Sequence, residues 1–550
     1  MSGVSRRITR RGLAGARGLV TGLMIVLFLA ACGETPLPFV PTPAPTPERP
    51  HQLTVSALTG GTGVPIAGAE LRVDGTTVAT GANGSAAISA LRGARVSASA
   101  AGFDAAEGSV PASGDLRIEM RSNVVRGVVT DGKGKPVEGV RIFVDGNAQV
   151  ARSDAQGRYE LPAVPETGTL VYKMPGYRLG EIPIDEQMTK DVALEPFEAH
   201  ALYAPASVFE APGRLDEMLS LIDRSEINAM VIDVKETGGN LYWATDLPIA
   251  HQVGSVMEHP LFELDKLLPK LKQRGIYTIA RMVSMKDNTL GAARPDLAVK
   301  NAATGKPWTD NIGGIWLDPS APGVAEYLAA IAGDLADKGF DEVQLDYIRF
   351  FSDGPYDLAD TNLPNTQSVR LPAIRRVLRV VSDALAHRKA FLSADCFPIA
   401  FIVPDDQGIG QRPEVIMPYV DYFSPMVYPS HYGPGVFGFP VPNEHPYEVI
   451  NQSLKIMNQE RAGLPMAIRP WIQDFGYGDF PPYSAADVQA EMKAARDNGT
   501  KGFMIWNASA RFTEAALGPP RPDESAGPMR STAHPASSAA APSPSGSSSP

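Results

Sequence analysis

The sequence predicts two small antiparallel β-sandwich modules followed by an α/β domain of the (β/α)8 barrel type, the TIM barrel. Three observations predict this multidomain fold. A segment of ~70 residues near the N-terminus occurs twice. From residue 196 onward, apolar strand-like runs alternate with amphipathic stretches. Proline-rich and serine-rich segments flank this folded middle part of the chain.

Length and composition agree with several domains. The chain has 550 residues, 49 of them proline and 52 glycine, and at roughly 100–200 residues per domain it is too long for one. Proline and glycine together are too few for a wholly disordered chain, so we expect disorder only locally. Two cysteines cannot form a disulfide framework or a four-thiolate zinc site, and the eight histidines contain no His-Glu-x-x-His spacing. We therefore expect no metal and no cofactor.

The N-terminal residues have the pattern of an export signal. Five arginines and no acidic residue lie within 1–31, whose apolar run of about 14 residues is shorter than the ~20 that a bilayer span needs. Leu29-Ala30-Ala31-Cys32 resembles the bacterial lipoprotein cleavage box, which implies that Cys32 is lipidated. We expect a lipid-anchored protein of the cell membrane that faces the extracellular or periplasmic side. Either the Sec or the twin-arginine route could export it.

Composition also divides the rest of the chain. Seven prolines between residues 35 and 50 predict a semi-rigid spacer, and the Pro-, Ser- and Ala-rich C-terminus buries too little to order itself. Loss of the five signal arginines takes the formal charge from -11 to -16, which disfavours a nucleic-acid partner. The predicted divisions are signal peptide 1–31, linker 32–50, β modules 51–122 and 123–195, barrel 196–517 and disordered tail 518–550.

The two β modules are predicted from an internal repeat with an offset of 71 residues. Residues 63–75 align with residues 134–146, and short alternating strands separated by Asp-Gly and Gly-Lys turns favour an antiparallel sandwich in each copy. The second copy resembles the carboxypeptidase regulatory-like family through Ser153-Asp154-Ala-Gln-Gly157-Arg-Tyr159 and Pro175-Gly176-Tyr177. The first copy is a degenerate version of it. Neither copy contains a candidate catalytic cluster.

The barrel is predicted from eight apolar runs, at 200–203, 229–234, 277–282, 342–345, 390–394, 422–427, 466–470 and 502–505. Helical patterns lie between them, at 215–223, 264–274, 324–338, 371–387, 447–460 and 485–498. Eight strands fit a (β/α)8 barrel better than an open doubly wound sheet. The sequence also has no Gly-x-Gly-x-x-Gly motif after the first strand, which a dinucleotide-binding open sheet would show.

Candidate functional residues lie where the predicted strands end, since that face of a barrel carries the chemistry. A lone Asp there is often a helix N-cap, but Asp346 lies three residues before Arg349, which we expect to keep its carboxylate ionised. Most tryptophans pack in cores, but a ring at a strand end can cover the apolar face of a sugar. Carboxylates combined with aromatic rings are expected of a glycosidase. The predicted substrate-binding residues are Asp233, Lys235, Arg281, Arg349, Trp243, Tyr428, His431, Trp471 and Trp506.

Three motifs make a family resemblance specific. They are Val231-Ile-Asp233-Val-Lys235-Glu236, Asp341-Glu-Val-Gln-Leu-Asp346-Tyr-Ile-Arg349 and Asp421-Tyr-Phe-Ser-Pro425-Met-Val-Tyr428. Over about residues 199–515 the chain resembles the "Putative glycosyl hydrolase domain" family, which implies a TIM barrel distantly akin to the α-amylase-like hydrolases. By that likeness the nucleophile, acid/base and stabilising aspartate fall on Asp346, Asp395 and Asp474. At strand 5 those enzymes usually have Glu where this chain has Asp395.

The leading hypothesis is a membrane-anchored glycoside hydrolase that acts on an extracellular or envelope polysaccharide or oligosaccharide. The alternative is a glycan-binding surface lipoprotein with a degenerate, non-catalytic barrel. A Schiff-base aldolase would need Lys235 inside the barrel, and a metal-dependent hydrolase would need histidines gathered at strand ends. Cys396 has no partner thiol and is expected to be buried and inert.

Overall fold

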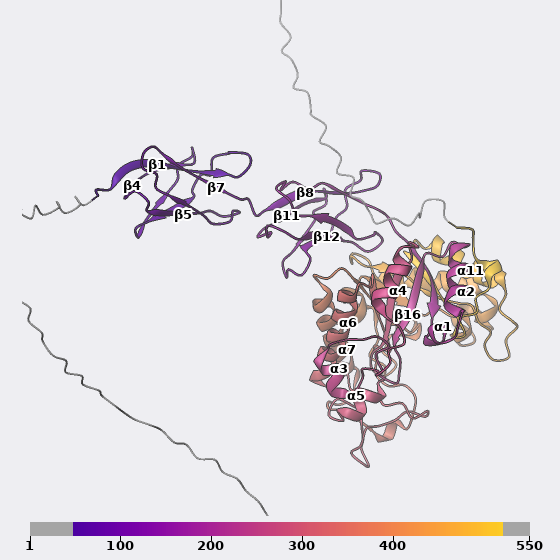
Figure 1. The fold of residues 1–550 in the computed structure, drawn as a ribbon. Helices are drawn as coiled ribbons and strands as arrows, with labels where there is room; N and C mark the ends of the chain where they lie inside the picture. Colours follow the sequence, from indigo (N-terminus) through magenta and orange to yellow (C-terminus); the bar gives the residue numbers. More distant parts are fainter. Residues whose placement is uncertain (1–47, 521–550) are drawn as a thin grey trace, which may run out of the picture.

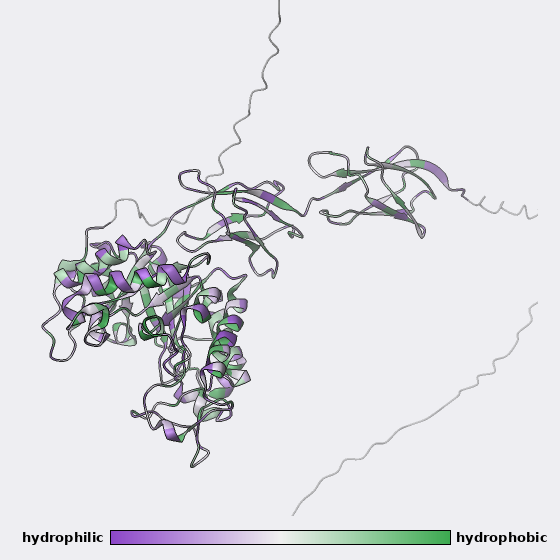
Figure 2. Cartoon of the chain, turned by 180° about the vertical axis from the view of Figure 1, so that it is seen from behind, coloured by the Kyte–Doolittle hydropathy of each residue, from purple (hydrophilic) through white to green (hydrophobic). Residues whose placement is uncertain are grey.

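A computed structural model describes residues 48–520 as two β modules followed by a barrel (Figure 1). The predicted signal peptide, Cys32, almost all of the proline-rich linker and nearly all of the predicted tail lie outside the described residues. In Figure 2 the helices of the barrel carry both hydrophilic and hydrophobic residues, as amphipathic helices on the outside of a domain do. No helix within residues 48–520 is long and apolar enough to cross a membrane.

The first module packs a three-stranded sheet, β4-β1-β7, against a four-stranded sheet, β3-β2-β5-β6. Alternating side chains such as Leu53, Val55 and Ala57 on β1 point into one apolar core between them. The strands are β1 (His51–Thr59), β2 (Glu70–Val73), β3 (Thr76–Ala79), β4 (Ser85–Ala90), β5 (Arg95–Ser99), β6 (Ala106–Ser109) and β7 (Leu116–Met120).

The second module repeats this arrangement with sheets β11-β8-β14 and β10-β9-β12-β13. In each module the last strand lies parallel to the first, an addition to the predicted antiparallel pattern. Gly157 in the Asp-x-x-Gly turn has φ +73°, and a Cβ there would lie 2.3 Å from the carbonyl oxygen of Val129. The strands are β8 (Val125–Asp131), β9 (Arg141–Val144), β10 (Val150–Arg152), β11 (Arg158–Leu161), β12 (Thr169–Lys173), β13 (Gly180–Pro183) and β14 (Val192–Leu194).

The third part has all eight predicted strands in one parallel sheet, in the order β23-β22-β21-β19-β17-β16-β15-β25-β24. The seventh barrel strand is split at Arg469-Pro470, because proline lacks the N–H that continues the ladder. Its halves β23 and β24 pair with β22 and β25, and Met426 bridges to Trp471, so the barrel closes. The strands are β15 (Ala199–Ala204), β16 (Ala229–Lys235), β17 (Tyr277–Val283), β19 (Glu342–Asp346), β21 (Phe391–Cys396), β22 (Tyr422–Pro425), β23 (Ala467–Ile468), β24 (Trp471–Gln473) and β25 (Gly502–Trp506).

Helices surround this barrel, and all six predicted ones are present. They are α2 (Arg214–Asp223), α4 (Leu264–Lys272), α6 (Pro322–Lys338), α7 (Gln367–Leu385), α10 (Pro446–Glu460) and α11 (Ala485–Asp497). Shorter helices are α1 (Ala206–Glu210), α3 (Pro248–Val253), α5 (Asn288–Ala293), α8 (Ile399–Ile402) and α9 (Pro413–Ile416). A small two-stranded ladder joins β18 (Lys300–Asn301) to β20 (Ala359–Asp360), which links the loops after the third and fourth barrel strands.

The second β module docks on the end of the barrel where the strands begin. Arg141 of β9 forms an ion pair with Asp421, which directly precedes β22. Lys173 of β12 is fully buried and donates to the carbonyl oxygens of Ala390 and, at 3.4 Å, Leu385. The Tyr422 hydroxyl accepts from a backbone N–H of the module. These contacts lie at the opposite end of the barrel from the predicted site.

Lys173 makes this docking sensitive to pH. Burial lowers its pKa to about 7, although Asp421 opposes the shift. Between pH ~7 and ~10 the folded protein therefore binds fewer protons than the unfolded chain, and stability rises with pH by up to about 1.4 kcal/mol per unit. We expect denaturant unfolding followed at several pH values to show this slope and the Lys173→Met variant to lose it.

Lys389→Met is the matched control for that measurement. Lys389 also spans the contact, with ion pairs to Asp145 and Glu181, but it is one-third exposed and its pKa is raised. Its replacement should leave the slope in place. An unchanged slope in Lys173→Met would show that the buried lysine does not titrate in this range.

Candidate active site

Arg281 lies at the centre of a cluster of acidic side chains where the barrel strands end. Its guanidinium donates to Asp346 Oδ2 from Nε at 3.1 Å and from Nη2 at 2.5 Å. On its other side Nη1 donates to Asp233 Oδ1 at 2.5 Å and to Glu236 Oε1 at 3.3 Å. Arg281 is 4% exposed, so one buried cation serves three carboxyl groups.

Strand register brings these residues together. Asp233 on β16 pairs with Arg281 on β17, and Asp346 on β19 pairs with Val283, two residues beyond Arg281. Because side chains alternate along a strand, Asp233, Arg281 and Asp346 all point to the same side of the sheet. An irregularity between Asp233 and Lys235 ends the regular pairing of β16 just before Glu236.

Asp395, at the end of β21, is a buried acid beside this cluster. Its Oδ1 accepts from the indole N–H of Trp471 at 2.8 Å, and its Oδ2 has no hydrogen-bond partner. Burial raises the pKa of Asp395 well above its usual range, and the negative charge of Asp346 adds to the shift. Burial therefore favours the protonated form of this carboxyl group. Burial raises the pKa of the Tyr428 phenol well above its usual range, and the negative charges of Asp395 and Asp346 add to that shift.

An aromatic wall borders the cluster. The Trp506 ring stacks on Tyr203 with centroids 4.0 Å apart, and it meets Trp471 edge-on at 5.5 Å. The Arg281 guanidinium lies 5.3 Å from the centre of the Trp506 ring. Trp506 also borders a pocket of about 480 Å3, whose lining residues are Tyr428, His431, Phe475, Gly476, Tyr477, Trp506, Asn507, Ala508 and Ser509.

Arg349, which we expected to keep the Asp346 carboxylate ionised, forms no hydrogen bond or ion pair with it among the described residues. The guanidinium lies among the rings of Trp316, Tyr347 and Phe397 at 4.7–5.0 Å, and its Nη1 donates to Phe350 O and Ser352 Oγ. The arginine that binds the Asp346 carboxylate is Arg281 and not Arg349. Between Asp346 and Arg349 in the chain, Tyr347 adopts φ +53°. This left-handed conformation costs a tyrosine free energy and turns the chain sharply after Asp346.

Three other predicted site residues lie apart from the cluster. Both carboxylate oxygens of Asp474 accept from Thr513, from its N–H and its hydroxyl, at 2.7 Å each. Lys235 is fully buried in an ion pair with Asp287 at 2.9 Å. Trp243 is fully buried and donates to Asp334 on α6 at 2.8 Å. The structure therefore does not bring Asp474, Lys235 or Trp243 to the Arg281 cluster.

Two residues of the cluster were not among the predicted site residues. Tyr203 lies near the end of the first barrel strand and its hydroxyl donates to Asp233. Glu236 directly follows the second strand and accepts from the same Arg281 nitrogen as Asp233. A signal was present for both, because each lies at a strand end in the sequence.

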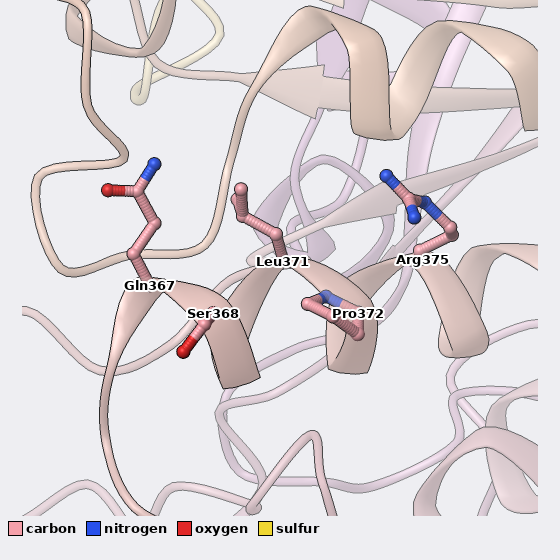
Figure 3. Close-up of a pocket in the computed structure, with 5 residues that line it drawn as sticks. All are labelled: Gln367, Ser368, Leu371, Pro372 and Arg375. Atoms are coloured by element: carbon pink, nitrogen blue, oxygen red, sulfur yellow. The ribbon is translucent and has the colours of Figure 1, made fainter.

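A separate hollow of about 510 Å3 lies along the first turns of α7 (Figure 3). Gln367, Leu371 and Arg375, spaced four residues apart, point to the same side of the helix in that view. No strand-end residue lines this hollow. Within residues 48–520 no three His, Cys, Asp or Glu side chains are arranged to hold a metal ion, and Cys396 is buried with a raised pKa.

This fold and site define a (β/α)8 barrel with an arginine-centred acid cluster at its strand ends. The chain belongs to the family described as "Putative glycosyl hydrolase domain", whose profile matches residues 201–512. The "Carboxypeptidase regulatory-like domain" profile matches residues 124–195. Both resemblances seen in the sequence are thereby confirmed.

Among solved structures, a hypothetical protein from Ruminiclostridium thermocellum is 32% identical, with 35% of this chain and 96% of that chain covered and a TM-score of 0.32. The PgaB (BpsB) glycoside hydrolase domain from Bordetella bronchiseptica is 15% identical over 57% and 95%, with a TM-score of 0.42. An α-galactosidase from Thermus thermophilus is 14% identical over 68% and 75%, with a TM-score of 0.38. No curated protein matches the chain at a significant level.

Proposed function

We propose that the barrel hydrolyses glycosidic bonds in a polysaccharide or oligosaccharide. The observation that carries this proposal is a carboxylate in an ion pair, Asp346, beside a protonated acid, Asp395, at neighbouring strand ends. Glycoside hydrolysis needs two carboxyl groups in different protonation states, one as nucleophile or base and one as proton donor.

In this proposal Asp346 is the nucleophile or base, since Arg281 orients it with two hydrogen bonds. Asp395 is the residue that the sequence suggests as the proton donor, and its burial favours the protonated form. Asp474 keeps only the role of a helper, because both of its oxygens are already bound to Thr513. An aldolase is less favoured, because Lys235 is paired with Asp287 and closed off from the cleft.

The aromatic pocket beside Trp506 is the proposed sugar-binding site. Flat rings bind the apolar face of a pyranose, and Tyr428, His431, Phe475, Tyr477 and Trp506 all line this pocket. No lysine or arginine is among its lining residues. A neutral or cationic sugar therefore suits the pocket better than an acidic one.

We further propose that the protein is displayed on the cell membrane through lipidated Cys32. Support comes from the lipoprotein-like box in the sequence and from the way the second module docks. The module contacts the barrel at Asp421 and Tyr422, where strand β22 begins. An N-terminal anchor would therefore hold the barrel by the end opposite the acid cluster and leave the cluster open to a polymer.

The test is turnover of a panel of neutral, acidic and amino-sugar polysaccharides by the purified protein, measured as new reducing ends. Product from a neutral or amino-sugar polymer is expected. Saturable binding of a panel member without product would favour the alternative, a non-catalytic glycan-binding barrel. Neither binding nor product with any polymer would contradict both functions.

Truncation of Trp506 should weaken substrate binding. The Trp506→Ala variant loses the stacking surface over the pocket, so we expect KM to rise by about 3-fold to 10-fold, consistent with ~0.5–1.5 kcal/mol per aromatic contact. Tyr356→Ala is the control, because Tyr356 is 52% exposed and lies outside the pocket lining. Equal KM values for the two variants would remove Trp506 from the binding site.

A further inference from the structure

Access to the cleft differs sharply among the acids of the cluster. Asp395 is 1% exposed and Asp233 is fully buried. The Glu236 side chain is 33% exposed, against 10% for Asp346. A proton donor must come within hydrogen-bond distance of the leaving oxygen, which requires an exposed oxygen atom. Glu236 meets that requirement better than any other acid that Arg281 contacts.

Asp233 and Glu236 form a carboxyl–carboxylate pair. Both lie against the same nitrogen, with Asp233 Oδ1 2.5 Å and Glu236 Oε1 3.3 Å from Arg281 Nη1, so one proton held between the two groups relieves the repulsion of their charges. Burial raises the pKa of Asp233 well above its usual range. Burial would also raise the pKa of Glu236, but the hydrogen bond from Asp233 and the Arg281 charge lower it. The two shifts have opposite signs, so the proton of the pair favours Asp233, which shares the Arg281 contact with the more exposed Glu236.

Arg281 connects this pair to Asp346. Its Nη1 contacts both members of the pair, and its Nε and Nη2 contact Asp346. When Asp346 is a carboxylate, the positive charge of Arg281 faces two negative charges, one on Asp346 and one shared by Asp233 and Glu236. If Asp346 became a neutral ester, the same guanidinium could balance a doubly charged pair, and the total charge of the cluster would not change. Charge on Asp346 and the proton on the pair are thus linked through one cation.

We infer that Glu236 is a further catalytic residue, which transfers the proton to and from the reacting oxygen while Asp233 holds it at rest. This inference rests on the proposed glycoside hydrolysis. It gives Glu236 the donor role that the sequence suggested for Asp395, which keeps its proton throughout under the indole of Trp471.

The reaction then consists of two displacements at the anomeric carbon. An Asp346 oxygen bonds to that carbon and the glycosidic C–O bond breaks. The leaving oxygen takes the proton of Glu236, which Asp233 has passed to it, and the pair becomes doubly charged. Water then gives a proton back to Glu236, its oxygen bonds to the anomeric carbon, and Asp346 leaves as a carboxylate. The product configuration is retained, since two displacements occur.

The first experiment compares two leaving groups in the Glu236→Gln variant. For a glycoside that the wild type hydrolyses, we expect bond cleavage to fall by about 10²-fold to 10⁴-fold with an unactivated alcohol as the leaving group. The loss should be much smaller with a dinitrophenyl leaving group, which needs no proton. If the loss of cleavage depended on the leaving group in Asp395→Asn and not in Glu236→Gln, Asp395 would be the proton donor. That result would overturn the inference and leave the proposed function standing.

Glu258→Gln is the matched control, because Glu258 lies exposed in the same loop after β16. This substitution replaces the same carboxylate by the same amide, at a position away from Arg281. Wild-type rates are expected for both leaving groups. Wild-type rates in Glu236→Gln as well would exclude proton transfer by Glu236.

The second experiment needs no substrate. The infrared C=O band of the protonated pair is identified by its loss in Asp233→Asn and followed against pH. Asp346→Asn imitates the neutral ester, so the midpoint at which this band disappears should fall by about 1 to 3 pH units. An unchanged midpoint would overturn the link through Arg281, whether or not any glycan is hydrolysed.

Discussion

Replacing Asp346 by Asn is expected to lower glycan hydrolysis by at least about 10³-fold, since the residue that we propose as the nucleophile or base would be lost. The amide cannot act as a nucleophile, and Arg281 loses its ion-pair partner on that side. Initial rates of reducing-end release at saturating substrate measure the effect on kcat.

The fold should survive this substitution. Asn has nearly the same shape as Asp, and Arg281 keeps its hydrogen bonds to Asp233 and Glu236. Thermal unfolding of the variant therefore separates loss of chemistry from loss of structure. Asp357→Asn is the matched control, because Asp357 is exposed in the loop after the same strand. Hydrolysis by Asp346→Asn at the wild-type rate would remove Asp346 from the reaction.

The barrel could be predicted from the sequence because its strands are buried on both sides. Runs such as 229–235 and 277–283 are buried at every position, so they appear in the sequence as mostly apolar segments, with the site residues Asp233 and Arg281 near their ends. The six long helices followed from their amphipathic spacing. The split of the seventh strand at Arg469-Pro470 has a local signal in the proline itself.

The acid cluster was predicted only in part, and side-chain direction explains the difference. Asp346, Arg281 and Asp233 were selected because they lie at strand ends, and parallel register brings them together. Position at a strand end does not tell which way a side chain points. Asp474 therefore turned out to bind Thr513, and Trp243 to pack against α6.

The choice of arginine shows the limit of sequence proximity. Arg349 is three residues from Asp346, whereas Arg281 is 65 residues away. The left-handed turn at Tyr347 directs Arg349 into an aromatic cage, while strand register brings Arg281 to the carboxylate. No local pattern predicts a contact that depends on the alignment of two strands.

The docked β module could not be predicted either. Lys173 is the last residue of a strand whose final four positions are all buried, and only the fold shows that its side chain enters the barrel end beside Asp421. The contact links the two parts by buried charge as well as by apolar packing. It thus fixes which end of the barrel faces the module and which end is left for the acids.

Replacing Arg281 by Leu should destabilise the barrel far more than the loss of a surface arginine. It leaves Asp346, Glu236 and Asp233 gathered in a buried site without their cation. Removing one partner of a buried ion pair costs about 3–5 kcal/mol. We expect that decrease in the free energy of unfolding at pH 7.5, measured by urea denaturation, together with loss of hydrolysis.

The sign of the pH dependence distinguishes this cause from simple misfit. With Arg281 removed, burial is expected to raise the pKa of Glu236 above its value in the unfolded chain, so protonation favours the folded variant. The decrease in the free energy of unfolding relative to wild type should therefore be largest at neutral pH and become smaller as pH falls toward 5. Arg294→Leu is the control: Arg294 is 44% exposed and pairs only with Asp296 in the same loop, so a change within about 0.5 kcal/mol is expected. If the free energy of unfolding of Arg281→Leu stayed below the wild-type value by the same amount from pH 7.5 to 5, lost packing and not uncompensated charge would explain the destabilisation.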